Sequence, residues 1–269
     1  MARKGGTRIP IGVSAVIAPP KSEAGGGDAL LEQFTREFTA VLQLAREKQA
    51  KELAATTFGC DKGDVANAPQ EVAFFGSIAQ KLVPLVDRLV HAPPEHLSVA
   101  KKTELLLLMG DKFFQAQEFR AASVFFYEKA LEEDASVDSQ GEPTPHATPH
   151  SACDRILAAA SASTTSRSST EGQAYVRALF GVAMCCFHVQ KRLDGCIRHP
   201  GTLEKMVEAL RLLQTGMEAA VALEPEYTNQ FSWLILNGSL LTFSIAKPLQ
   251  TMGFSREVVI YLKWCLLAM

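Results

Sequence analysis

The sequence of 269 residues lacks the strings that mark common catalytic and phosphate-binding sites. Neither G-x-x-x-x-G-K-[S/T] nor G-x-G-x-x-G occurs, so no glycine-rich loop is available to bind phosphate groups. G-x-S-x-G is also absent, and no cysteine has a recognisable histidine partner motif. We therefore expect no catalytic residue and no cofactor, and an enzyme is the least favoured class.

Cysteine pairs and excess charge are missing as well. The six cysteines show no C-x-x-C spacing, and a chain of this length does not need disulfides to fold, so a reducing, cytoplasmic compartment is expected. Lys and Arg total 27 against 29 acidic residues, which leaves a net charge of −2. Because this balance creates no basic field, we expect neither nucleic acid nor a membrane as a partner.

No apolar run is long enough to span a membrane. Asn237, Lys247 and Pro248 are among the residues that interrupt the most apolar stretch, 233–252. The basic N-terminus and the apolar run 9–18 imitate a signal peptide, but Pro10 breaks the run and secretion or import is disfavoured.

The residues present favour a folded helical protein. Hydrophobic residues make up 47% of the chain and charged residues 21%, and apolar residues recur at spacings of three and four with no competing strand pattern. We predict an all-α fold of antiparallel helical hairpins. The expected parts are a disordered tail at 1–27, a helical region at 28–134, a low-complexity Ser/Thr/Pro-rich linker at 135–172, and further helical hairpins at 173–269.

Residues 105–131, LLLLMGDKFFQAQEFRAASVFFYEKAL, fit the pattern of a tetratricopeptide-like hairpin. Small residues at the helix contact and aromatic residues beside them stand in register, although Ala130 arrives one residue later than the pattern requires. This spacing favours a tetratricopeptide-like α-solenoid. The candidate helix-packing or partner-contact residues of this hairpin are Gly110, Phe113, Phe119, Ala122 and Phe126.

A second helical pairing is expected at 233–267, with a turn at Gly253 that needs backbone freedom. Trp233, Tyr261 and Trp264 suit either a core or a partner surface, and their helical spacing favours the core. The final apolar helix has no cap or charged last turn, so we expect the chain to be a fragment whose next helices would cover it. Asn237 and Gly238 begin an N-x-S sequon that lies within this pairing and is expected to be unmodified.

Several local expectations follow from individual residues. Asp28 is expected to cap the first helix and Thr202 a later one. Pro84 is expected to kink or split the helix at 71–90. A short helical turn is expected within the linker, at 153–160.

Cysteine and histidine residues gather at 185–199, where they raise the question of zinc. Neighbouring helix positions face different directions, so a four-ligand site is disfavoured and buried core cysteines are the favoured interpretation. The proline-rich linker makes a second set equally unsuited to a fixed site. The residues considered are Cys185, Cys186, His188, Cys196 and His199, and in the linker His146, His150 and Cys153.

The strings WLILNGS at 233–239 and GFSREVVIYLKW at 253–264 resemble the N-terminal region of the cilia- and flagella-associated protein 54 family. The string LMGDKFF, with Glu118, Phe119 and Ala122, is similar to an earlier segment of that family. The resemblance implies a large structural scaffold of the C1d projection in the central apparatus of the ciliary or flagellar axoneme, needed for motility. It also implies other projection proteins, and calmodulin, as partners.

A second class of function stays open. A soluble tetratricopeptide-like adaptor would bind an extended peptide in its concave groove. Chaperone-tail clamps of that class use a Lys and an Asn, whereas the equivalent positions here are Leu107 and Asp111. This disfavours the chaperone-tail version of the adaptor.

Overall fold

The computed structural model describes residues 26–57, 68–136, 155–157, 168–223 and 230–268. Every regular element in these ranges is helical, so the all-α prediction is confirmed. Residues 155–157 form a short helical turn within the predicted linker. The predicted tail up to residue 25, and most of the linker, lie outside the described residues.

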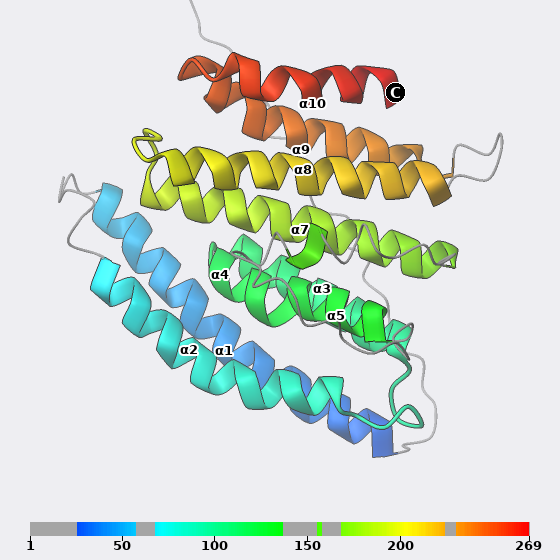
Figure 1. Ribbon diagram of the computed structural model, residues 1–269. Coiled ribbons are helices and arrows are strands. Elements are labelled where there is room, and N and C mark those ends of the chain that lie inside the picture. Colours follow the sequence, from blue (N-terminus) through cyan, green and yellow to red (C-terminus); the bar gives the residue numbers. More distant parts are fainter. Residues whose placement is uncertain (1–25, 58–67, 137–154, 158–167, 224–229, 269) are drawn as a thin grey trace, which may run out of the picture.

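The helices stack in successive pairs from one end of the molecule to the other (Figure 1). One continuous apolar core runs through the stack. The last pair forms the end opposite the first pair (Figure 1). Whether the pairs repeat as a tetratricopeptide-like solenoid stays a prediction. The pairs are α1 (Gly26–Thr57) with α2 (Ala68–Val90), α3 (Val99–Gln115) with the segment α4 (Phe119–Ala122), η1 (Ser123–Tyr127) and α5 (Glu128–Ser136), α7 (Ser169–Leu193) with α8 (Pro200–Leu223), and α9 (Ser232–Thr251) with α10 (Ser255–Ala268).

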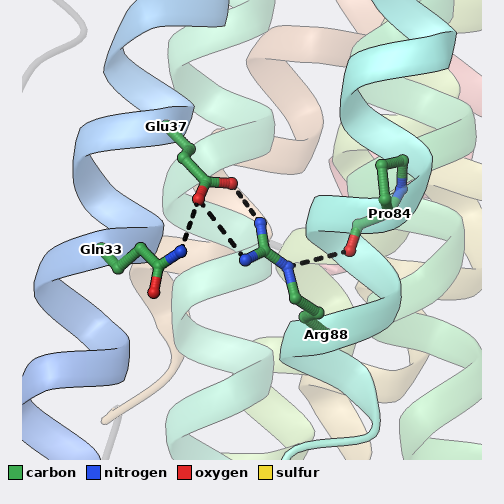
Figure 2. Close-up of polar contacts among 4 residues, drawn as sticks. All are labelled: Gln33, Glu37, Pro84 and Arg88. Atoms are coloured by element: carbon green, nitrogen blue, oxygen red, sulfur yellow. Dashed lines mark hydrogen bonds and ion pairs between the residues drawn. The ribbon is translucent and has the colours of Figure 1, made fainter.

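An ion pair between Glu37 and Arg88 joins α1 to α2 (Figure 2). The bonds from Arg88, followed by a bond of 2.9 Å from Nε2 of Gln33, hold the pKa of Glu37 below its ordinary value. Arg88 also donates from Nε to the carbonyl oxygen of Pro84 at 3.3 Å. Helix α2 continues through Pro84, so of the two outcomes predicted for this proline, a kink or a split, the split does not occur.

Two predicted helix starts are wrong. Asp28 lies inside α1, which begins at Gly26, and Thr202 lies inside α8, where its side chain is buried. Helix α8 begins at Pro200, a position that suits proline because the first helical N–H has no partner within the helix.

Helix α7 begins earlier than expected. A capping box joins the hydroxyl of Ser168 to the backbone N–H of Glu171 and the Glu171 carboxylate to the Ser168 backbone N–H. These reciprocal bonds satisfy two N–H groups that a helix start leaves unpaired. The cap starts the helix at Ser169, so residues 169–172 belong to α7 and not to the predicted linker.

The pair of α3 with the segment α4–η1–α5 is called the first hairpin below, after the predicted tetratricopeptide-like hairpin that it contains, and the pair of α9 with α10 is called the last hairpin. The second helix of the first hairpin contains a π-helical segment, η1, between α4 and α5. The backbone N–H of Glu128 bonds to the carbonyl oxygen of Ser123, five residues earlier. A π turn adds one residue to a helix without breaking it. This extra residue explains why Ala130, which is buried, comes one position later than the tetratricopeptide pattern requires.

The turns of the first and last hairpins share one geometry. The N–H groups of Gln117 and Glu118 bond to the carbonyl oxygens of Phe114 and Phe113, and those of Gly253 and Phe254 bond to the equivalent carbonyl oxygens of Gln250 and Leu249. Both are Schellman motifs, which place the middle residue of the turn in the left-handed region. The φ angle is +61° at Gln117 and +96° at Gly253.

Candidate interaction surfaces

Aromatic residues form the centre of the first hairpin. The ring of Phe113 on α3 lies 5.2 Å from that of Phe126 on η1, and Phe38 of α1 contacts both, with centroids 5.7 and 6.1 Å away. Phe119 and Ala122 are also buried. All of these residues, including four of the predicted candidates, therefore face the interior rather than a free surface.

Two glycines on different helices enclose the ring of Tyr127. A Cβ atom on Gly110 of α3 would lie 2.8 Å from Cε1 of Tyr127, and one on Gly181 of α7 would lie 2.6 Å from the same ring. Atoms cannot approach so closely, so a methyl group at either position would force the Tyr127 ring or the backbone to shift. Both positions therefore suit glycine, which has no side chain. The predicted candidate Gly110 thus contacts Tyr127, a residue that the sequence pattern did not single out.

A polar chain continues from the enclosed tyrosine to α7. The Tyr127 hydroxyl donates to Oδ1 of Asp111 at 2.7 Å, and Nη2 of Arg177 lies 3.1 Å from Oδ2 of the same carboxylate. Burial, followed by the charge of Asp111, raises the pKa of Tyr127 well above its ordinary range. Asp111, one of the two positions compared with a peptide clamp, is thus engaged within the fold, and Leu107, the other, is buried.

The cysteine and histidine residues of α7 have different environments and different partners. Cys185 is buried, and burial raises the pKa of its thiol; the Sγ of Cys186 donates to the carbonyl oxygen of Lys205 at 3.5 Å. His188 stacks on Phe119, with ring centroids 4.5 Å apart. Within the described ranges, no group of three or more His, Cys, Asp or Glu side chains is arranged to hold a metal ion. His146, His150 and Cys153 lie outside those ranges.

An open groove of about 180 Å³ lies between η1, α7 and the first turns of α8. Its lining is largely apolar, with Val124, Val182 and Val189, and it also includes charges of both signs, from Arg120 and Lys205 and from acidic residues. Such a groove suits an apolar side chain of a protein partner better than a small charged ligand. The remaining lining residues are Ser123, Glu128, Cys185, Cys186, Gln190 and Glu208.

The predicted residues of the last hairpin divide between the interior and the surface. Tyr261 is buried and Trp264 is partly buried against the core, but Trp233 is 43% exposed, so the core interpretation of Trp233 is wrong. Asn237 is exposed. Gly238 is buried, and a Cβ atom at this position would lie 2.4 Å from Cγ of Met217. The absence of a side chain at Gly238 lets α9 lie close to α8.

The surface of the last hairpin is unusually apolar. Many of its large side chains are exposed, and their number along two adjacent helices exceeds the scattered apolar residues of an ordinary surface. Exposed large apolar side chains that gather on one pair of helices suit a protein–protein contact. The exposed residues are Trp233, Leu236, Leu240 and Phe243 on α9, Met252 in the turn, and Val259, Ile260, Leu266 and Leu267 on α10.

Sequence reasoning missed two features of these sites. Gly181 lies in the middle of α7, where glycine lowers helix stability. A glycine at such a position is the sequence signal that could have indicated a close contact. The Thr242 hydroxyl is fully buried without a hydrogen-bond partner, in a helix position that the pattern alone could not assign to the core.

Comparisons with known proteins agree with the resemblance. A family model described as "Cilia- and flagella-associated protein 54" matches residues 96–269. The Chlamydomonas reinhardtii protein named "Cilia- and flagella-associated protein 54" is 28% identical over 194 residues, which cover 71% of this chain and 5% of the relative. The chain therefore spans a small part of the length of this relative.

No solved structure was found to match the chain. None of the described helices is both long and apolar enough to cross a membrane. The family match covers the first hairpin, both helices of the α7–α8 pair and the whole of the exposed last hairpin. The chain belongs to the cilia- and flagella-associated protein 54 family, within its N-terminal region.

Proposed function

We propose that this chain is a structural, protein-binding segment of a cilium or flagellum scaffold, located in the axoneme. The observation that carries the proposal is the family match over residues 96–269, which includes every helix from α3 onward. The exposed apolar side chains of α9 and α10 support an assembly role, because protein contacts often bury such side chains.

Within the axoneme, the proposed place is a projection of the central apparatus. The chain contributes there to projection assembly, and hence to motility, without catalysis. Its partners are other projection proteins, and calmodulin is a further partner by resemblance. The mixed charges that line the η1 groove suit protein partners better than nucleic acid.

Deletion of the gene in a flagellated cell tests this function. Electron micrographs of axoneme cross-sections should lack a central-pair projection, and beating should be impaired. Re-expression of the intact gene is the control for an effect of the deletion alone. Complete axonemes with normal beating would contradict the scaffold.

The second candidate is an adaptor that binds an extended peptide, which the groove beside η1 favours. Val124→Asp places a charge on an exposed groove residue, whereas Leu240→Asp places one on the exposed surface of α9. Partners recovered with the unaltered protein but lost only with Val124→Asp would favour the adaptor. Partners lost only with Leu240→Asp would favour the scaffold.

A further inference from the structure

The open groove beside η1 has room for one side chain of a binding partner. Its volume of about 180 Å³ can be compared with a protein cavity of about 150 Å³ that accepts a benzene molecule. Val182 is buried at the groove, whereas Val124 is 43% exposed and offers apolar surface to a group that enters. Val124 belongs to the π-helical segment, and such segments are frequent at functional sites. One aliphatic or aromatic side chain therefore fits here, while the rest of its chain stays outside.

The exposed charged residues of the groove lining are cations. Arg120 of α4 and Lys205 of α8 are both exposed, and they come from different helices. Neither forms an ion pair with an acidic residue in the part of the chain that the structure describes. The Cζ atom of Arg120 lies 5.1 Å from the ring centroid of Phe75, a contact that supplies no carboxylate. Both cations are thus available to an acidic group from outside.

The acidic residues of the lining are engaged within the fold. Glu128 is half-buried, and its Oε1 accepts a hydrogen bond of 2.7 Å from the hydroxyl of Ser123. Glu208 is also half-buried and also has a partner. A segment that approaches from solvent therefore meets the exposed side chains of Arg120 and Lys205 before it meets either carboxylate.

We propose that this groove binds an extended, acidic segment of a partner protein, with one apolar side chain in the groove and carboxylates that pair with Arg120 and Lys205. Burial of the apolar side chain supplies affinity, and the two cations select the charge of the segment. Because they repel a basic segment, the groove also discriminates against one. The inference rests on the second candidate function, the peptide-binding adaptor, and names the chemistry of its peptide.

The test uses the purified full chain and three labelled synthetic peptides of equal length. The first carries one leucine between glutamates, the second has serine in place of the leucine, and the third has lysines in place of the glutamates. Fluorescence anisotropy should show the first peptide binding about tenfold tighter than the second, as expected for partial burial of one apolar side chain. It should bind about tenfold tighter than the third, because two exposed attractions replace two repulsions.

Variants of the chain connect these affinities to the groove. The double variant Arg120→Glu/Lys205→Glu should weaken binding of the first peptide about tenfold and strengthen binding of the lysine peptide. Val124→Asp should weaken binding of the first peptide, since it places a carboxylate where the leucine enters. The matched control is Lys191→Glu, the same change of charge at an exposed residue of α7 outside the groove lining, which should leave both affinities unchanged. If circular dichroism shows that the double variant is unfolded, Lys205→Glu alone replaces it.

A photoreactive leucine in the first peptide locates the binding site. Crosslinks mapped by mass spectrometry should fall within residues 120–128, 182–190 and 205–208, which contain the groove lining. Crosslinks to α9 or α10 would place the peptide on the exposed apolar side chains of the last hairpin and would overturn the proposal.

Other outcomes also overturn it. These are no binding of the first peptide, equal binding of the leucine and serine peptides, or competition by a single-stranded RNA as effective as that by the unlabelled first peptide. The RNA result would identify nucleic acid as the ligand. Loss of cellular partners with Val124→Asp but no binding of these peptides would retain the adaptor and reject its acidic peptide. None of these outcomes concerns the cilium, so the deletion experiment decides the scaffold function separately.

Discussion

The hydroxyl of Tyr127 donates a hydrogen bond of 2.7 Å to Oδ1 of Asp111, sixteen residues earlier on the facing helix. The ring below this hydroxyl lies against both Gly110 and Gly181. One buried tyrosine therefore joins α3, η1 and α7, and Arg177 extends the connection through the Asp111 carboxylate. This contact couples the first hairpin to the helix that follows it.

The space for this ring gives the first prediction. Gly181→Ala should lower the free energy of unfolding by about 1–3 kcal/mol, because the added methyl group overlaps the Tyr127 ring. Gly76→Ala is the matched control: a Cβ atom there meets nothing within 4 Å, so replacement of a helical glycine should stabilise by about 0.5–1 kcal/mol. Urea unfolding followed by circular dichroism measures both, and equal effects would contradict the enclosed ring.

The hydrogen bond itself gives a second prediction. Tyr127→Phe keeps the ring and removes the hydroxyl, so it should cost about 1 kcal/mol of unfolding free energy. Ala122→Leu, by contrast, adds volume at a fully buried position and should cost about 1–3 kcal/mol through overpacking. Urea unfolding again measures both. A Tyr127→Phe variant as stable as the parent would show that the bond to Asp111 adds nothing.

The buried hydroxyl of Thr242 gives a prediction of the opposite sign. Thr242→Val replaces an unpartnered hydroxyl with a methyl group of similar shape and should stabilise the fold by about 1–2 kcal/mol. Thr251→Val is the control on the same helix, since Thr251 is exposed and its hydroxyl donates to the carbonyl oxygen of Lys247. Calorimetry should show a higher melting temperature for Thr242→Val only; a decrease would indicate a partner for this hydroxyl.

Protonation of His188 gives a pH-dependent prediction. Burial, followed by the charges of Lys191 and Arg192, lowers the pKa of His188 from 6.5 to about 4. Between these values the unfolded chain binds more protons than the folded one, so stability should fall as the pH falls. Allowing for partial exposure, the loss should be about 1–2 kcal/mol. His188→Gln, compared with the parent by urea unfolding at pH 7 and pH 4, should remove this part of the decrease; identical pH profiles would contradict the shift.

The helical fold was predictable because it depends on local spacing. Phe113 and Phe126 recur at positions that a helical hairpin brings together, and both are buried. Spacing also identifies an apolar side of α9, but it cannot tell which neighbouring element covers that side. For this reason Trp233 was expected in the core and is exposed.

Other features depend on contacts between distant segments or on backbone hydrogen bonds, which the sequence does not show. Tyr127 and Gly181 are 54 residues apart, and nothing near either residue identifies the other as its partner. The π segment left one trace in the sequence, the late Ala130, whose cause only the backbone hydrogen bonds reveal. Prediction of the helix starts was wrong for a similar reason. Ser168 and Thr202 are both good caps by residue type, but only Ser168 lies directly before a helix.

The central claim is that this chain is part of an axonemal scaffold. The most direct measurement is the location of the full-length protein, tagged at its own gene, in a motile flagellated cell, followed by detergent extraction of isolated flagella. The account predicts that the tagged protein lies along the flagellum and stays with the axoneme after extraction. A protein that is diffuse in the cell body, or that is released completely by detergent, would contradict it.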